Sequence, residues 1–345
     1  MNREILRQDI RRFAQDFPLF ERLRGKSFLL TGATGLIGSI FAKCLLEINR
    51  YRQLELTVYA NVRDIMKAER LFEDYSEIHL ITNPLEQFDE ATTPSIDYLI
   101  HLASPTASHY FVSHPVETFR TIVDGTDAVL RFAQNNQVTT FLYVSSMEVY
   151  GVLPKGVIAT EDRMGYIDPT KARSSYSMGK RAAETLCFNY YNEFGLDVRI
   201  ARLAQTFGAG ISEDENRVFA QFAKSILFNR DIVLHTSGES SHCYCYTTDA
   251  ISALLYIILC GKAGIAYNVG NKDTYCSIRE MAELVCHSFS TASSLRIDLD
   301  PSAPFPPATF LQLDMSRLEQ LGWTPQYSLK EMYERLLCYL CPSCH

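Results

Sequence analysis

The segment that most restricts how this chain folds is a glycine-rich turn near its start, Gly32-Ala33-Thr34-Gly35-Leu36-Ile37-Gly38. An apolar run of strand length precedes the turn, and a helical pattern of apolar residues follows it. Glycine at such a junction lets the backbone turn tightly and lets a pyrophosphate approach the N-terminus of the helix. The segment therefore predicts a dinucleotide-binding unit at the start of a sheet, with these residues at the cofactor: Gly32, Thr34, Gly35, Leu36, Ile37 and Gly38.

Strand and helix patterns alternate beyond the turn. Apolar segments of strand length occupy residues 54–62, 78–82, 96–103 and 139–146, and a helical pattern covers 116–134. Parallel strands need intervening helices as crossovers, so this alternation predicts an α/β fold. Specifically, we expect a Rossmann-type, doubly wound parallel sheet with helices on both faces.

The pattern changes in the second half, where loops lengthen before a helix over Ser177–Glu193 and a core strand over 198–208. We expect a helical extension over residues 1–24 that docks on the body. Residues 25–205 are expected to form the NAD(P)-binding Rossmann domain that carries the catalytic residues. Residues 206–345 are expected to form mainly a smaller C-terminal, substrate-binding lobe, with some segments returning to the sheet domain.

Two residues at the end of the second predicted strand bear on the choice of cofactor. An acidic residue about twenty positions after the glycines commonly binds the adenosine ribose of NAD. Asp64 is suited to that contact, whereas Arg63 beside it is suited to the additional phosphate of NADP. The sequence therefore leaves both cofactors open.

A tyrosine and a lysine four residues apart, Tyr176 and Lys180, begin a predicted helix and share one of its faces. We expect the Lys180 charge to lower the pKa of the phenol, so that Tyr176 exchanges a proton with a sugar hydroxyl as a hydride moves to nicotinamide. Ser146, at the end of the fifth predicted strand, supplies a further hydrogen bond to the same oxygen. Together with the glycine turn, this pattern predicts a catalytic set.

Glu148 follows the predicted strand that ends at Ser146. Once C4 of a sugar is a ketone, the proton on C5 becomes acidic, and a carboxylate beside the ring can remove it. We therefore predict that Glu148 is catalytic, with a buried carboxylate that caps the next loop as the alternative.

The charge balance restricts the partners of this chain. It carries 33 Lys and Arg residues against 40 Asp and Glu residues, a formal net charge of −7. We therefore expect neither a nucleic-acid nor a membrane partner, since both require a basic face. The longest apolar run, residues 251–260, is about half of the ~20 residues that a membrane span needs. No signal-peptide pattern begins the sequence, so we expect a cytoplasmic protein with reduced thiols.

Two groups of cysteines resemble metal ligands. Cys243 and Cys245 alternate along a predicted strand, so their side chains point to opposite faces and cannot share a metal. The end of the chain has metal-ligand spacing, but it lacks a further partner and is expected to be a thiol-rich tail. We expect no metal site there, at Cys338, Cys341, Cys344 and His345.

From about residue 25 to 335 the sequence resembles the extended branch of the short-chain dehydrogenase/reductase superfamily, the nucleotide-sugar epimerases, dehydratases and decarboxylases. The motifs are most similar to UDP-glucuronate decarboxylase. The resemblance implies tightly bound NAD, a homodimer formed through the helix of Tyr176 and Lys180, and cofactor contacts from Leu102, Ala103 and Ser104. It is carried by TGATGLIG, HLASPTASHYFVSHPVET, SSMEVYG, YSMGKRAAETLCFNYY, VRIARLAQTFG and LDMSRLEQLGWTP.

The resemblance also implies a substrate site for a nucleoside-diphosphate sugar. The residues at its positions are Ser104, Ser146, Met147, Gln205, Arg217, Val218, His235 and His242.

Several of these positions depart from the family pattern. His242 stands where an arginine normally meets a phosphate or a uronate carboxylate, and a neutral imidazole donates one hydrogen bond rather than a bidentate pair. His242 therefore weakens the case for decarboxylation. Met147 stands where the dehydratases have an acidic residue, which weakens the case for dehydration. The remaining departures are Gln205 and Ile122, each in place of Asn, and His235 in place of an aromatic residue.

These features predict an enzyme that oxidises C4 of a nucleotide-linked sugar with NAD, uses the transient ketone for epimerisation, elimination or decarboxylation, and returns the hydride. One alternative is an NADPH-dependent reductase of a nucleotide-linked keto sugar or ketose. Another is a non-catalytic nucleotide-binding regulatory protein on the same scaffold.

Overall fold

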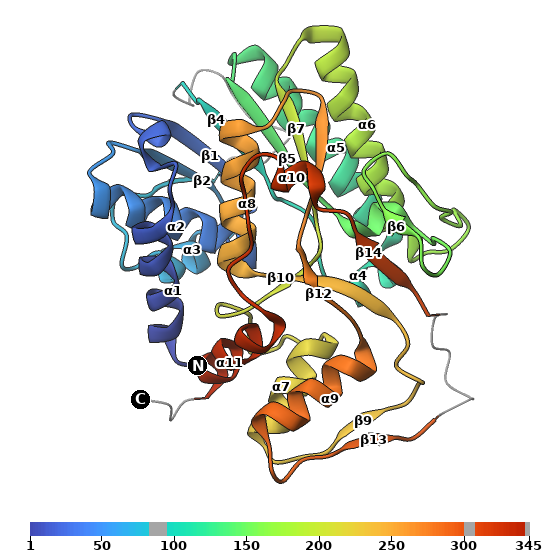
Figure 1. The fold of residues 1–345 in the computed structure, drawn as a ribbon. Helices are drawn as coiled ribbons and strands as arrows, with labels where there is room; N and C mark the ends of the chain where they lie inside the picture. The colour runs from blue at the N-terminus through green and yellow to red at the C-terminus, as the bar shows by residue number, and fades with distance from the viewer. Residues whose placement is uncertain (83–94, 300–307, 342–345) are drawn as a thin grey trace.

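The computed structural model describes residues 1–82, 95–299 and 308–341. A seven-stranded sheet of order β11-β7-β5-β4-β1-β2-β3 forms its larger part (Figure 1). Every pair of neighbouring strands is parallel, which confirms the predicted fold class. The strands are β1 (Ser27–Thr31), β2 (Thr57–Asn61), β3 (His79–Ile81), β4 (Tyr98–His101), β5 (Thr140–Ser146), β7 (Val198–Leu203) and β11 (Ile265–Val269).

Helices cover both faces of this sheet because its strands are apolar on both sides. In β1, Phe28 and Leu30 pack on one face, whereas Leu29 packs on the other. The first face is covered by α2 (Leu36–Arg52) and α8 (Thr247–Cys260). The second is covered by α5 (Pro115–Asn135) and α6 (Ser174–Phe194). Two shorter helices, α3 (Ile65–Leu71) and α4 (Ser108–Ser113), follow β2 and β4.

A second, smaller sheet has the order β12-β10-β14-β6, with β8 paired to β10. Its strands are β6 (Ile158–Ala159), β8 (Gln205–Phe207), β10 (Ser241–Tyr246), β12 (Asn271–Ser277) and β14 (Phe310–Leu313). In Figure 1 this part lies below the seven-stranded sheet and carries the remaining elements. These are α7 (Val218–Leu227), α9 (Ile278–Phe289), α11 (Leu329–Leu340) and the strand pair β9 (Ile232–Leu234) and β13 (Leu295–Ile297), while α10 (Ser316–Glu319) lies beside β11.

The expected core strand over 198–208 is two strands in the structure. β7 pairs with β11 in the large sheet, whereas β8 pairs with β10 in the small one. The backbone N–H of Ala204 donates to Val269 O at 2.7 Å, and directly after this residue the chain passes between the sheets. A continuous apolar run does not reveal that its two halves have different partners.

The N-terminal helix α1 (Arg3–Asp16) docks on the body and covers part of the expected extension over residues 1–24 (Figure 1). Ile10 and Phe13 enter the core shared with α2 and α8. Asp9, only 1% exposed, accepts a hydrogen bond of 2.6 Å from Tyr246 Oη and pairs with Arg335 of α11. A short 3₁₀ helix, η1 (Phe20–Leu23), then leads into β1.

No helix in the described ranges is both long and apolar enough to span a membrane. The described cysteines are free thiols, and no cluster of metal-ligating side chains occurs in these ranges. Cys243 and Cys245 pack into different apolar cores, in agreement with the prediction that they point to opposite faces. Cys344 and His345 lie outside the described residues.

Asp249, in the first turn of α8, joins this helix to the segment before α11. Its Oδ2 accepts the backbone N–H groups of Gln326 and Tyr327 at 3.0 and 3.1 Å. Burial raises the pKa of the carboxyl group from 3.8 to about 7, against these two hydrogen bonds. A raised folded-state pKa means that Asp249 adds stability when protonated, and that this contribution is lost as pH rises through 7.

We predict that the free energy of unfolding of the wild-type protein falls between pH 4 and 7, relative to Asp249→Asn, by a few kcal/mol. Each pKa unit corresponds to about 1.4 kcal/mol, and asparagine keeps an oxygen acceptor without a titratable charge. Urea unfolding of both proteins at several pH values measures the difference. Parallel pH profiles would show that the folded-state pKa of Asp249 is not raised.

Candidate active site

The glycine turn lies directly against the end of β4. Gly32 has φ +68°, and a Cβ atom there would stand 2.7 Å from Ala103 N. A Cβ atom on Gly38 would stand 2.4 Å from Gly32 O. Thr31 fixes the same contact, because its Oγ1 accepts the backbone N–H groups of Leu102 and Ala103 at 3.2 and 3.3 Å. Backbone approaches this close require glycine at both positions.

The start of α2 is suited to a pyrophosphate. Gly35 is its N-cap residue and, lacking a side chain, leaves the first helical N–H groups uncapped. Such groups and the helix dipole attract phosphate oxygens. Residues of the turn and of the segment after β4 meet here. Those that are at least partly exposed are Gly32, Thr34, Gly35, Leu36, Ile37, Leu102, Ala103 and Ser104, whereas Gly38 is buried.

The two residues that bear on the cofactor choice differ in their local roles. Asp64 is the N-cap of α3, and its Oδ1 accepts the backbone N–H of Lys67 at 2.9 Å. This cap occupies one of the carboxylate oxygens that the sequence assigned to ribose. Arg63 is exposed and lies close enough to Tyr110 to affect its pKa.

Three of the predicted catalytic residues meet where β5 ends and α6 begins. The Tyr176 phenol is 8% exposed and hydrogen-bonded with Ser146. The Lys180 ammonium donates to Val144 O at 2.9 Å and lies 5.8 Å from the Tyr176 ring centroid. Parallel pairing of β1 with β4 and of β4 with β5 sets this strand end on the same edge of the sheet as the glycine turn, because the carboxyl ends of parallel strands share one edge.

The electrostatics of Tyr176 differ from the expectation. Burial raises the pKa of its phenol well above the usual range, and the Glu148 carboxylate raises it further. The Lys180 ammonium is directed to the carbonyl oxygen of Val144, and burial lowers its own pKa to about 8. The groups that oppose the rise are Ser146, Arg173 and Arg217.

Glu148 lies in the 3₁₀ helix η3 (Met147–Tyr150), and both of its oxygens are bonded. Arg173 Nη2 donates to Oε1 at 2.7 Å, and Ser177 Oγ donates to Oε2 at 3.2 Å. The Glu148 side chain is 30% exposed, so it is not sunk in the core. Its charge lies close enough to Tyr176 to raise the pKa of the phenol.

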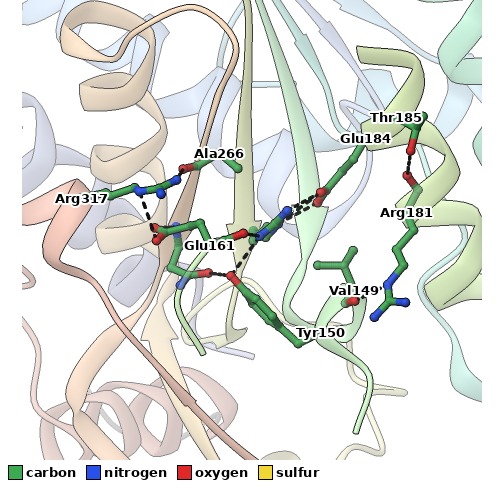
Figure 2. Close-up of polar contacts among 10 residues, drawn as sticks. Val149, Tyr150, Glu161, Arg181, Glu184, Thr185, Ala266 and Arg317 are labelled. Atoms are coloured by element: carbon green, nitrogen blue, oxygen red, sulfur yellow. Dashed lines mark hydrogen bonds and ion pairs between the residues drawn. The ribbon is translucent and has the colours of Figure 1, made fainter. Parts of the chain in front are cut away.

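A buried polar network holds η3 in place behind the site. Arg202 of β7 pairs with Glu184 of α6 at 2.7 Å and donates to Tyr150 Oη at 3.1 Å. Tyr150 in turn donates to Asn268 Oδ1 at 2.6 Å, and Arg202 also donates to Glu161 O at 2.7 Å. Figure 2 shows Tyr150, Glu161 and Glu184 converging on this cluster from different elements. The network therefore fixes η3 relative to both β7 and α6.

Three of the predicted substrate residues belong to the smaller part of the fold, in β8, before α7 and in β10. Gln205 begins β8 and is partly exposed. Arg217, the N-cap of α7, pairs with Glu215 at 2.6 Å and is close enough to act on the pKa of Tyr176. His242 in β10 bonds through Nε2 to Thr309 Oγ1 at 2.9 Å. Burial lowers the pKa of His242, so it offers a neutral imidazole.

The other predicted substrate residues vary in their surroundings. Val218 begins α7, and Met147 packs against the small core around Val149. Ser104 Oγ donates to Pro105 O at 3.1 Å. His235 is exposed just after β9, and its Nδ1 lies 3.2 Å from Asp298 O.

Two residues that sequence reasoning missed lie in the same place. Phe111 of α4 stacks on the Tyr176 ring, with centroids 4.3 Å apart and ring planes 10° apart. Arg173, three residues before Tyr176, lies over Phe111 and pairs with Glu148. The spacing of Arg173 from Tyr176 was a usable signal in the sequence, whereas nothing linked Phe111 to that tyrosine.

Comparisons with known proteins establish the family of this chain. A model of the NAD-dependent epimerase/dehydratase family matches residues 28–270. UDP-glucuronic acid decarboxylase 6 of Arabidopsis thaliana is 30% identical over 327 residues, covering 91% of this chain and 90% of that protein.

Solved structures show the same fold. An epimerase from Methanothermobacter thermautotrophicus has a TM-score of 0.77 at 20% identity, covering 98% of this chain and 96% of its own. A UDP-glucuronic acid 4-epimerase from Bacillus cereus, in complex with UDP-glucuronic acid and NAD, has a TM-score of 0.74 at 20% identity, covering 91% and 98%. By its family match and its whole-chain relative, this chain belongs to the NAD-dependent epimerase/dehydratase family, as the sequence motifs predicted.

Proposed function

We propose that this enzyme binds NAD tightly at the glycine turn and oxidises C4 of a nucleoside-diphosphate sugar, whose transient 4-keto form then reacts further. The observation that carries the proposal is the convergence of Ser146, Glu148 and Tyr176 where β5 ends and α6 begins. Bound at the turn, NAD would supply the hydride acceptor for oxidation of the sugar carbon and the hydride donor for the reverse step.

The roles of the chain's own groups follow from their positions. Tyr176 Oη takes the proton of the sugar hydroxyl, Ser146 Oγ orients the same oxygen, and Lys180 supplies positive charge beneath the ring. Glu148 handles the C5 proton of the ketone or shapes the ring. The diphosphate lies toward Gln205, Arg217 and His242.

The relatives favour decarboxylation as the reaction that follows oxidation, because the matched Arabidopsis protein is named for it. The neutral His242 argues against it, since it offers a uronate carboxylate one hydrogen bond and no charge. Incubation with a panel of nucleotide sugars, followed by mass spectrometry, identifies the reaction. Loss of carbon dioxide indicates decarboxylation, loss of water indicates dehydration, and an unchanged mass indicates epimerisation.

Arg63 supports a second candidate, an NADPH-dependent reductase, because its guanidinium is exposed at the end of β2. The cofactor content of the purified protein separates the two. Near-stoichiometric NAD(H) released on denaturation supports internal recycling, whereas an empty protein that consumes added NADPH supports the reductase.

A homodimer through α6 is a further proposal. The helices α5 and α6 pack against each other, and both carry exposed apolar side chains that support the proposal. These side chains are Val116, Phe119, Tyr191 and Phe194.

Substitutions in the glycine turn should separate cofactor binding from folding. Gly35→Ala places a Cβ atom 3.3 Å from Gly32 O, a contact that a small shift relieves, so the fold should survive while the pyrophosphate is displaced. Gly38→Ala places it at 2.4 Å and should lower both the melting temperature and the NAD content. NAD(H) released on denaturation and thermal melting measure the two effects. Full NAD content in Gly35→Ala would place the pyrophosphate elsewhere.

Tyr176→Phe should reduce turnover by about 10²–10⁴-fold, the usual contribution of a general acid–base group, without unfolding the protein. Tyr51→Phe, an exposed tyrosine near the end of α2, is the matched control and should retain activity. Turnover and circular dichroism are measured on both. Retained activity in Tyr176→Phe would remove this residue from the mechanism.

Glu148→Gln should spare oxidation at C4 but block the steps after it, because the amide cannot accept the C5 proton. The absorbance of bound NAD should therefore still show its reduction by the substrate, while mass spectrometry detects no product. An unchanged product yield would show that Glu148 has no part in the chemistry.

A further inference from the structure

Arg173 lies at the N-cap position of α6, three residues before Tyr176, and the proposed mechanism does not use it. Its Nη2 donates to Glu148 Oε1 at 2.7 Å. Its guanidinium carbon lies 4.9 Å from the centroid of the Phe111 ring. Arg173 therefore contacts both a carboxylate and an aromatic ring that bear directly on the catalytic phenol.

The aromatic contact fixes where the Tyr176 ring can lie. Phe111 is 1% exposed and stacks on Tyr176 at 4.3 Å between ring centroids. The guanidinium over Phe111 makes a cation–π contact, which holds both groups in one arrangement. α4 is short, so this contact ties a small helix to the start of α6.

The charges around Tyr176 leave Arg173 a specific role. Several elements place polar or charged groups near the phenol. They are β5 with Tyr143 and Ser146, η3 with Glu148, α6 with Lys180, and α7 with Arg217. His242 of β10 lies near Glu148. Glu148 is the group on this list that opposes ionisation of Tyr176. Arg217 is already paired with Glu215, whereas Arg173 is paired with Glu148 itself.

The guanidinium also retains an unusual donor. Arg173 Nη1 is buried and has no hydrogen-bond partner among the described residues, although the side chain as a whole is 41% exposed. A buried donor of a charged group without a partner costs free energy, so an arginine kept only for packing is a poor choice here. A role in the site accounts for its presence.

We propose that Arg173 is a positioning residue for the catalytic base: it neutralises Glu148 beside Tyr176 and holds the Phe111 ring against the phenol. This inference rests on the proposed function, in which Tyr176 exchanges the proton of the sugar hydroxyl. Loss of the Arg173 charge should then make Tyr176 harder to ionise, whereas mere loosening of the site would make it more accessible.

The first test needs no turnover. N-acetylimidazole acylates tyrosine in its ionised form, and peptide mass spectrometry measures its rate at Tyr176 in the purified protein. Arg173→Gln should slow this rate by about tenfold, since loss of one nearby charge shifts a pKa by about one unit or more. Arg173→Lys should keep most of the rate, and Arg163→Gln, an exposed arginine of the preceding loop, should leave it unchanged. A faster or unchanged rate in Arg173→Gln would overturn the proposal.

The second test uses the pH profile of NAD reduction by the substrate. Raising the pKa of the base moves the low-pH limb of the profile to higher pH. Arg173→Gln should therefore shift this limb upward by about one unit, and by less when Glu148 is also replaced by Gln. A uniform loss of rate at every pH would mean a purely structural role. If the wild-type protein oxidises no nucleotide sugar, the proposed function fails, and the acylation rates alone decide the role of Arg173.

Discussion

The buried guanidinium of Arg202 is the interaction on which the geometry of the site depends. It is 3% exposed, and its charge is balanced by Glu184, which is 5% exposed. Burial acts to lower the pKa of Arg202, but the hydrogen bonds and charge of Glu184 raise it above its usual range, so the pair remains ionised. Removing one partner of such a pair costs about 3–5 kcal/mol, because the remaining charge is left in the core. The remaining N–H groups of Arg202 bind Tyr150 and Glu161.

These bonds connect parts of the chain that are distant in sequence. Glu184 belongs to the helix that carries Tyr176, and Tyr150 closes the 3₁₀ helix that carries Glu148. Glu161 follows the short strand β6 of the small sheet and accepts the backbone N–H of Asn268 in β11. One buried cluster therefore sets the catalytic helix, the carboxylate and the junction of the two sheets relative to one another (Figure 2).

Burial shapes the chemistry of the site as much as charge does. Burial raises the pKa of Tyr176 and lowers those of Lys180 and His242. Each of these shifts favours the neutral form of the group, as low polarity requires. An ionised Tyr176 therefore depends on nearby cations and donors, and these come from the starts of α6 and α7 and from the end of β5 rather than from Lys180 alone. The net charge of −7 does not predict a cation at this position. The fold nevertheless places Arg173 and Arg217 close enough to lower the pKa of Tyr176.

The sequence by itself determined the strand–turn–helix unit, the parallel sheet and the family, because periodicity and the spacing of Gly32, Gly35 and Gly38 are local. It also named Ser146, Tyr176 and Lys180, which the fold then brought together. Only the tertiary structure decided that the run over 198–208 divides between two sheets, and that Phe111 stacks on Tyr176 with the Arg173 guanidinium over the Phe111 ring. These outcomes depend on which distant segments become neighbours and how deeply each group is buried, and no local pattern of residues records either quantity.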